Sequence, residues 1–405
     1  MSVLEDSTKF RPWSAYKVDE IDIDGHLISR YIGEFWTSRQ RQVQNIQEVP
    51  YRACFKPQLP AFFIEALTSP GETVYDPFAG RGTTPVTASL IGRCIIANDI
   101  NPLSEVFIKP RLFPPEQSDV VARLSEISYD LSLHAEFDLS MFYNQKTEAE
   151  LCSLRSYLMQ RKREGTFDYL DAWIQMVATT RLSGHSSGFF SVYTLPPNQA
   201  VLPSRQILLN EKREQIPPYR DTKELIAKKS KQLLSDLSKE EREMLHLSSK
   251  TAQIFCADAR STSLICSDSV DLTVTSPPFL NVVAYKTDNW LRCWFCDIDV
   301  DSVGSQITVT SDLGTWSAVM SDVFVELFRI TRPGGFVAFE VGEIRGGEIR
   351  LDESVVPLGL AAGFVCEGIV IHSQRFTKTA HIWGVSNMSN GTNTNRIVLF
   401  QKPVL

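Results

Sequence analysis

Hydrophobic residues cluster in seven short runs rich in β-branched side chains, a pattern typical of β-strands. These runs are Glu72–Asp76, Cys94–Asp99, Gln253–Ala257, Val270–Thr275, Gly335–Val341, Phe364–Ser373 and Arg396–Gln401. The first five are apolar on both faces and are separated by helical or glycine-bounded segments, as a parallel sheet covered by helices requires. The last two flank a loop rich in glycine and asparagine, around Asn387–Asn395, and predict a hairpin. The pattern therefore predicts an α/β fold with a mostly parallel, seven-stranded sheet.

The second and third predicted strands are separated by about 150 residues, far more than a crossover helix needs. This insertion contains helical patterns, among them Glu148–Gln160, Asp168–Arg181 and Glu224–Leu247, and a polar, glycine-punctuated stretch, Arg181–Gln199. We expect three regions. They are an N-terminal part of the main domain (residues 1–110), a largely helical insertion (111–250) and a C-terminal part of the main domain (251–405).

The fourth predicted strand ends abruptly in Ser276-Pro277-Pro278-Phe279. Two prolines can neither donate to a strand ladder nor continue it, so the chain must leave the sheet at Ser276. Such a turn brings together a hydroxyl, carbonyls without local donors, and an aromatic face. These groups suit a flat ring that carries an exocyclic amine. The alternative is a strand-ending turn without chemistry.

The first predicted strand is followed by a turn with two glycines and then by a helix, within the segment 76–84. Glycines allow the backbone to approach a ligand closely, and the free N–H groups of a helix start attract anionic groups. Asp99 ends the next strand, roughly two dozen residues after Asp76, which is the spacing of an acidic residue that binds a ribose diol. The segment therefore predicts a nucleotide-type ligand.

Together, Asp76-Pro77-Phe78-Ala79-Gly80-Arg81-Gly82-Thr83-Thr84 and Thr275-Ser276-Pro277-Pro278-Phe279 resemble the cofactor and catalytic motifs of the DNA amino-methyltransferases. The stretch Tyr51–Pro60 resembles the segment just upstream, which lines the methionine end of the cofactor in that family. The resemblance implies a Rossmann-like, S-adenosyl-L-methionine (SAM)-dependent methyltransferase fold with one antiparallel strand. The implied cofactor-binding residues are Lys56, Pro57, Asp76, Phe78, Gly80, Gly82, Thr83, Thr84, Asp99 and Asp258, and the implied catalytic residues are Ser276, Pro277, Pro278 and Phe279.

The family transfers a methyl group from SAM to the N4 of cytosine or the N6 of adenine, and the resemblance implies a role for each catalytic group. The Ser276 hydroxyl and the Pro277 carbonyl would accept hydrogen bonds from the target amine, and Phe279 would stack on its ring. Transfer would be direct, without a covalent enzyme intermediate. Family members that act on adenine usually have Asp or Asn where this chain has Ser276, so we expect cytosine N4. The alternatives are an adenine-N6 or RNA methyltransferase on the same fold, or a catalytically silent relative that binds nucleic acid.

Other positions have two interpretations. Asp258 would bind the adenine amine of SAM or cap a helix. Tyr285 and Trp290 would flank a flipped base or belong to the core. Arg81, where the family often has serine, has an open role, and so does Arg181–Gln199. The polar loop from His372 to Asn395 is a candidate for contact with the DNA backbone.

The net charge of −7 is unusual for a DNA-binding enzyme, but its distribution is uneven. Residues 151–250 hold 16 Lys and Arg against 11 Asp and Glu, with dense runs at Arg161–Arg163 and Lys223–Lys231. We therefore expect the insertion to be a target-recognition region for double-stranded DNA, whose target base is flipped out of the helix. The basic runs could equally be solvated helix faces. The alternative for the insertion is a role in oligomerisation or a purely structural role. The cofactor motif precedes the insertion and the catalytic motif follows it, an order that resembles one of the family's permuted classes. The match is imperfect, because the strand that ends near Asp258 follows the insertion instead of preceding it.

The remaining features limit the function classes. Eight cysteines in 405 residues do not form a disulfide framework. Cys293 and Cys296 have zinc-like spacing but no second Cys or His pair, so we expect buried thiols and no metal. The absence of a Pro-Cys dipeptide argues against a cysteine nucleophile. No stretch has transmembrane length and the N-terminus lacks a leader pattern, so we expect a cytoplasmic protein, or a nuclear or nucleoid-associated one, without membrane contact. A restriction endonuclease is a candidate partner.

Overall fold

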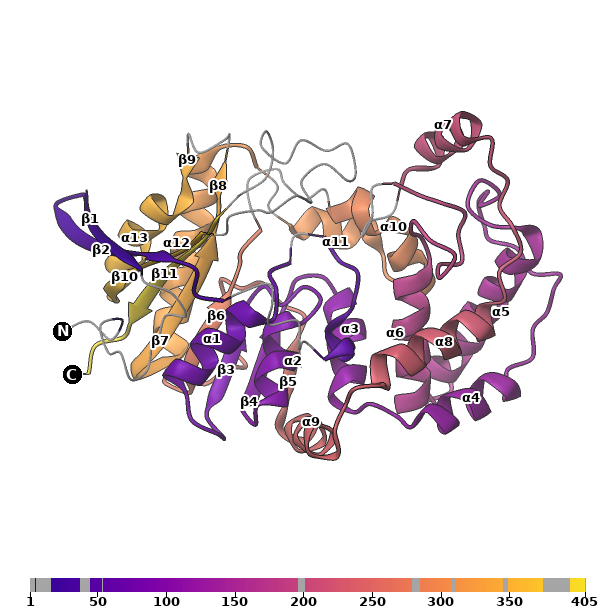
Figure 1. Cartoon of the computed structure of the whole chain (residues 1–405), viewed down its shortest axis with the longest axis horizontal. Coiled ribbons are helices and arrows are strands. Elements are labelled where there is room, and N and C mark those ends of the chain that lie inside the picture. The colour runs from indigo at the N-terminus through magenta and orange to yellow at the C-terminus, as the bar shows by residue number, and fades with distance from the viewer. Residues whose placement is uncertain are drawn as a thin grey trace.

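The computed structural model describes residues 4, 16–36, 44–52, 54–195, 201–278, 285–307, 310–344, 349–373 and 394–404. Its centre is a nine-stranded sheet with the strand order β1-β2-β10-β11-β7-β6-β3-β4-β5 (Figure 1). The strands are β1 (Lys17–Ile23), β2 (His26–Gly33), β3 (Thr73–Asp76), β4 (Cys94–Asn98), β5 (Gln253–Phe255), β6 (Val270–Thr275), β7 (Thr331–Val341), β10 (Val365–Ser373) and β11 (Thr394–Gln401). A separate two-stranded sheet pairs β8 (Glu343–Ile344) with β9 (Ile349–Arg350).

The sheet is mixed and mostly parallel, which confirms the α/β prediction. Strands β5, β4, β3, β6 and β7 are parallel to one another, and β11 runs antiparallel to both of its neighbours, β7 and β10. The predicted hairpin between the last two strands is therefore present. All seven predicted strands form, with shifts of a few residues at their ends.

The predicted number of seven strands is wrong, because an N-terminal hairpin extends the sheet. β1 pairs antiparallel with β2, and β2 adds to β10 in parallel, with Ile369 opposite Arg30. β1 is the edge strand and β2 lies next to it, and few positions of either strand are buried. Their turn, Asp24-Gly25, has positive φ at both residues, as a tight hairpin turn requires. This Asp-Gly pair between alternating residues was the available sequence signal.

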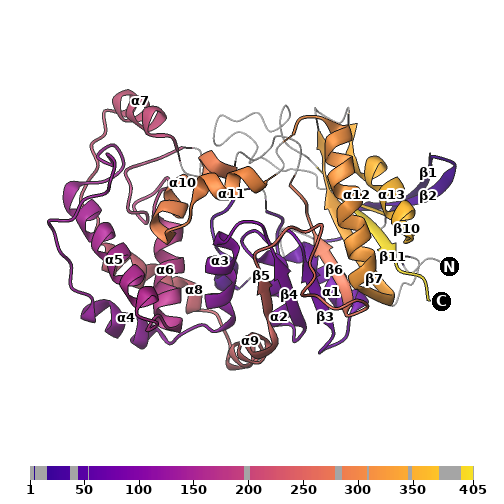
Figure 2. The ribbon, with the colours of Figure 1, turned by 180° about the vertical axis from the view of Figure 1, so that it is seen from behind.

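Helices cover both faces of the sheet (Figures 1 and 2). On one face lie α1 (Gln58–Leu67), α2 (Thr83–Leu90) and α9 (Lys239–Thr251), with α3 (Leu103–Leu112) beside them. On the other face lie α12 (Leu313–Ile330) and α13 (Leu351–Ala362). Each face of the sheet has its own hydrophobic core. Side chains alternate between the faces along β3, so Val74 packs into the core beneath α1 and α2, and Tyr75 into the core beneath α12 and α13.

The insertion forms a helical lobe beside the sheet, made of α4 (Gln117–Glu126), α5 (Gln145–Arg163), α6 (Tyr169–Arg181), α7 (Pro203–Arg213) and α8 (Thr222–Leu234) (Figure 1). The pattern at 224–247 predicted one helical stretch, but the chain breaks it into α8 and α9. Ser238 caps α9 and exchanges hydrogen bonds with Glu241, and this capping box starts a new helix that returns to the sheet next to α2. No helix in the described part of the chain is long and apolar enough to cross a bilayer.

Candidate functional site

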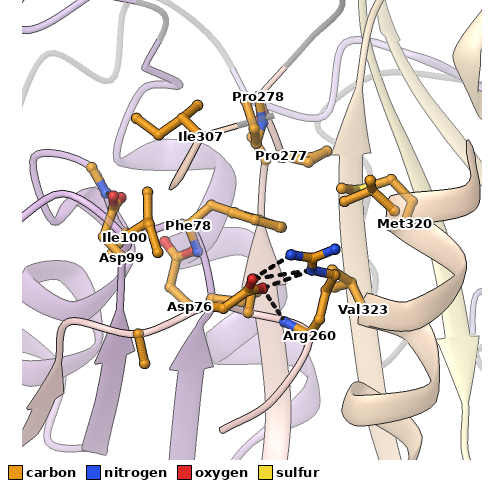
Figure 3. A pocket seen from close by; sticks show the side chains of 18 of the residues that line it. Asp76, Phe78, Asp99, Ile100, Arg260, Pro277, Pro278, Ile307, Met320 and Val323 are labelled. Carbon is orange, nitrogen blue, oxygen red and sulfur yellow. Dashed lines mark hydrogen bonds and ion pairs between the residues drawn. The ribbon is translucent and has the colours of Figure 1, made fainter. Parts of the chain in front are cut away.

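A cavity opens where the parallel strands β3, β4, β5 and β6 end, at their common carboxyl edge. Its walls come from the turn after β3, the residues after β4, β5 and β6, the Tyr51–Phe55 segment and one face of α12. Figure 3 shows Asp99 and Ile100 on one side and Met320 and Val323 on the other, with Pro277 and Pro278 between them. In open α/β sheets, this edge is the place where ligands bind.

Asp76 lies at the end of β3 and holds the first turn together. Its Oδ1 atom accepts hydrogen bonds from the Thr275 hydroxyl at 2.6 Å and from the Phe78 N–H at 3.1 Å. Burial raises the pKa of the Asp76 carboxyl to about 7, although these hydrogen bonds oppose the rise. Asp76 therefore joins the ends of two neighbouring strands, β3 and β6, below the cavity.

Asp99 supports the glycine turn from the next strand. Its Oδ2 accepts from the Gly80 N–H at 2.8 Å and its Oδ1 from the Asn101 N–H at 2.9 Å. Gly80 has a φ of +52°, a left-handed backbone conformation that glycine adopts more easily than other residues. Burial raises the pKa of Asp99 above its ordinary value, and the two backbone hydrogen bonds and the Ser104 side chain oppose the rise. A carboxylate can accept about four hydrogen bonds, so Asp99 retains acceptor capacity for a ligand hydroxyl.

Gly82 faces α3 rather than the cavity. A Cβ atom at this position would lie 2.3 Å from Ile108 Cγ1, and the φ of Gly82 is +82°. The residue begins α2 as its N-cap, and the helix packs closely against α3. Thr84 is also directed elsewhere, since its hydroxyl donates to the Val274 carbonyl at 3.0 Å, whereas Thr83 lines the cavity.

Arg81, whose role the sequence left open, ties the upstream segment to the turn. Its guanidinium donates to the Val49 carbonyl at 2.9 Å and to the Phe55 carbonyl at 3.3 Å, and its Nε donates to the Thr83 hydroxyl at 3.1 Å. The upstream segment lines the cavity through Tyr51, Arg52, Cys54 and Phe55. Lys56 is exposed and Pro57 caps α1, and neither belongs to the described wall of the cavity.

Asp258 lies after β5 on the cavity wall, but it is paired in this structure. The Arg260 guanidinium donates to both carboxylate oxygens, at distances from 2.6 to 3.1 Å. These hydrogen bonds hold the pKa of Asp258 below its ordinary value. The Arg260 N–H also donates to Asp258 Oδ1 at 2.9 Å, so the carboxylate shapes the loop as well as the cavity.

The predicted catalytic turn borders the same cavity. Ser276, Pro277 and Pro278 all line it, and Phe279 lies outside the described residues. The Ser276 hydroxyl bonds to the carboxylate of Glu340 on β7, which also accepts from Asn395 Nδ2 at 2.9 Å. Burial raises the pKa of Glu340, and the two hydrogen bonds oppose the rise. Sequence analysis missed Glu340, although an acidic residue in the apolar strand pattern of β7 was a usable signal.

Trp290, Cys293 and Cys296 pack in or against the hydrophobic core. The indole N–H of Trp290 donates to the Val201 carbonyl at 3.2 Å, and its ring packs near Phe137 and Phe142. Cys293 and Cys296 are buried free thiols on α10 (Tyr285–Cys296). Within the described ranges no cluster of three His, Cys, Asp or Glu residues could hold a metal ion. The side chain of Tyr285 and the loop at 374–393 lie outside the described residues.

Two cations of the basic runs are structural. Arg161 binds the buried carboxylate of Asp171, and Lys229 is only 7% exposed and pairs with Glu48 at 3.2 Å. Lys228 and Lys231, on the same helix as Lys229, are exposed. The runs are therefore partly core and partly surface, and only the exposed members are available to a polyanion.

Residues 15–105 match the family model described as DNA methylase. The chain is 30% identical over 123 residues to the type II methyltransferase M.MvaI of Kocuria varians, a match that covers 27% of each chain. It is 31% identical over 86 residues to the type II methyltransferase M.BsoBI of Geobacillus stearothermophilus, which covers 21% of this chain and 16% of that relative. A solved SAM-dependent methyltransferase from Methanosarcina mazei is 9% identical, with a TM-score of 0.33 over 85% of this chain and 98% of that one.

Residues 15–105, which contain the Asp76–Thr84 motif, therefore resemble the DNA amino-methyltransferases, whereas the Ser276-Pro277-Pro278 turn lies outside that match. That family includes enzymes that act on cytosine N4 and enzymes that act on adenine N6. The matches span 27% and 16% of the two type II methyltransferases.

Proposed function

We propose that this protein is a SAM-dependent DNA methyltransferase that modifies the exocyclic N4 of cytosine. The observation that carries the proposal is the position of the Ser276-Pro277-Pro278 turn. It borders the cavity that is shaped by the Asp76, Gly80 and Asp99 turn. Both motifs of a methyl-transfer site therefore face one space, although they are separated by nearly half of the chain.

The cavity suits the chemistry of SAM. Asp99 and Asp258 supply carboxylates for the ribose hydroxyls and the adenine amine, while Ile100, Ile307 and Met320 supply apolar surface for a ring. The Gly80 turn and the first N–H groups of α2 suit the charged methionine end. When bound, SAM would supply an electrophilic methyl group. Gly82 and Thr84 would act by shaping the turn, and Lys56 and Pro57 by positioning the segment that precedes α1.

Glu340 gives Ser276 a defined direction. With its hydrogen directed at the Glu340 carboxylate, the Ser276 hydroxyl would keep its oxygen lone pairs available to accept a hydrogen bond from the target amine. The Pro277 carbonyl would accept the second amine hydrogen, and Phe279 would stack on the ring. After transfer, the nitrogen must lose a proton. Glu340, whose pKa burial raises, can take that proton through the serine hydroxyl.

The neutral serine favours cytosine over adenine, and the product decides between them. DNA should be modified in cells that express the chain, digested to nucleosides and analysed by mass spectrometry. We expect N4-methylcytosine. N6-methyladenine as the only product would refute the cytosine assignment and leave the methyltransferase assignment intact.

Double-stranded DNA is the proposed substrate, and the helical lobe is the proposed recognition region. A duplex base can reach the cavity only when it is flipped out, at a cost of a few kcal/mol. Methyl transfer from labelled SAM to duplex DNA, single-stranded DNA and RNA tests this substrate class. Transfer to RNA alone would contradict the proposal.

A further inference from the structure

The turn after β6 cannot fix its own shape. Thr275, paired with Phe339 of β7, is the last residue of β6 in the ladder. Two prolines follow Ser276. They have no N–H group, so they cannot donate the backbone hydrogen bonds that normally hold a turn. Groups from other elements must therefore hold the Pro277–Pro278 segment.

The structure supplies such a group from α12. The indole N–H of Trp316 donates a hydrogen bond to the Pro278 carbonyl at 2.9 Å. Trp316 is 4% exposed and lies in the first turn of the helix, where Asp312 caps the helix by accepting from the Thr315 N–H at 2.7 Å. The donor is thus on a rigid, capped element and not on a loop.

The same side chain also belongs to the cavity wall. Trp316, Val319, Met320 and Val323 repeat at helical spacing and form the face of α12 that lines the cavity. Figure 3 shows Met320 and Val323 of this face across from Ile100. One helix therefore forms the apolar wall and holds the proline turn.

We propose that Trp316 is a positioning residue for methyl transfer, which fixes the Pro278 carbonyl and thereby the orientation of the catalytic turn relative to the cofactor cavity. This inference rests on the proposed function. By engaging the second proline carbonyl, Trp316 fixes the peptide that leads to Phe279 and leaves the Pro277 carbonyl for the target amine. The indole also contacts the cofactor space, so a single residue couples the two halves of the site.

Trp316→Phe separates these two roles, because phenylalanine keeps an aromatic wall but has no N–H donor. Trp173→Phe is the matched control. The Trp173 indole is fully buried and donates to the Ser230 hydroxyl at 3.0 Å, within the helical lobe. Both variants lose one buried indole hydrogen bond, so both should unfold at a somewhat lower temperature.

The experiment measures SAM affinity by calorimetry, the single-turnover methylation rate, and KM for DNA. We expect Trp316→Phe to bind SAM within about twofold of wild type and to methylate at least about tenfold more slowly, because small misplacement of reacting groups is costly. KM for DNA should change little. Trp173→Phe should methylate at the wild-type rate despite its lower stability.

Two outcomes would overturn the inference alone: an unchanged rate in Trp316→Phe, or an equal loss of rate in both variants. A wild-type protein that binds SAM and methylates no nucleic acid would instead overturn the proposed function, and the inference would fall with it.

Discussion

Three carboxylates around the cavity have different surroundings, and these surroundings decide what each can do. Asp76 is buried beneath the turn and joins two strands. Asp99 is buried beside the turn and holds Gly80. Asp258 is 41% exposed and is paired with Arg260. We therefore expect substitutions of Asp76 to affect mainly stability and its pH dependence, and substitutions of Asp99 to affect ligand binding.

Asp99→Asn should weaken SAM binding by roughly 1–3 kcal/mol, because the amide offers one acceptor oxygen where the carboxylate offers two. Calorimetry measures the affinity. Asp138→Asn is the control, since Asp138 is exposed and accepts from the Ser140 N–H at 2.8 Å, in the same local arrangement as Asp99 with Asn101. Unchanged affinity in folded Asp99→Asn would remove Asp99 from the cofactor site.

Asp76 should make the protein less stable as the pH rises. Its folded pKa of about 7 lies above the ordinary value for Asp, so the folded state binds the proton more tightly than the unfolded chain. The stabilisation is complete below about pH 4 and is lost as the pH rises through about 7. Asp76→Asn is neutral at every pH. Between pH 4 and pH 8, the wild-type protein should therefore lose roughly 1–4 kcal/mol more stability than this variant. Denaturant unfolding at both pH values measures this, and parallel pH profiles would contradict it.

At the scale of elements, the apolar pattern located seven of the nine strands of the main sheet, because strands that are buried on both faces have a strong and continuous signal. It missed β1 and β2, because few of their side chains are buried. It also joined α8 to α9, because the helical pattern continues through the break and only the Ser238 cap interrupts it. The glycine and proline motifs located the turns of the site. They could not reveal that Gly82 serves the contact with α3, or that Glu340 and Trp316 hold the proline turn, because those partners lie far away in the sequence.

The two ends of α2 allow a comparison of steric and backbone costs. Gly82→Ala should destabilise the protein by roughly 3 kcal/mol or more, because the methyl group meets Ile108 and φ is positive. Gly92→Ala shares the positive φ, but its methyl group meets only Met244 Sδ at 3.4 Å. It should cost about 1–2 kcal/mol, the price of the left-handed backbone alone. Denaturant unfolding of both variants measures the difference, and equal costs would show that α2 and α3 adjust to the added methyl group.

At the scale of the whole molecule, the helical lobe and the sheet share a core. One hydrophobic cluster includes Val86 of α2, Phe107 of α3, Trp173 of α6 and Ile226 of α8. A lobe joined in this way should hold a constant position relative to the cavity. Under the proposed function, DNA bound to the lobe would therefore present its base to the turn at a fixed distance.

Only the exposed lysines of α8 should contribute to DNA binding. Replacing Lys228 and Lys231 together with alanine should weaken DNA binding and reduce the steepness of its salt dependence, by about one phosphate contact for each lysine. SAM affinity should not change. Lys229→Ala should instead lower stability, because it leaves Glu48 without its ion-pair partner. Fluorescence anisotropy across a salt series measures the slope, and an unchanged slope would place the DNA surface elsewhere.

The segment that precedes α1 is held by guanidinium groups from three separate regions. Arg81 donates to Val49 and Phe55, Arg111 of α3 donates to Ile46 at 3.3 Å, and Arg292 of α10 donates to Pro50 at 3.0 Å, always to backbone carbonyls. Burial lowers the pKa of Arg111 to about 9, which leaves it charged at neutral pH. A fragment that begins at α1 would remove these carbonyl acceptors from guanidinium groups that are wholly or partly buried. Dissection of the protein should therefore fail at this boundary, and the segment from Ile46 to Phe55 must be supplied, in the same chain or as a separate peptide, for the cavity wall to assemble.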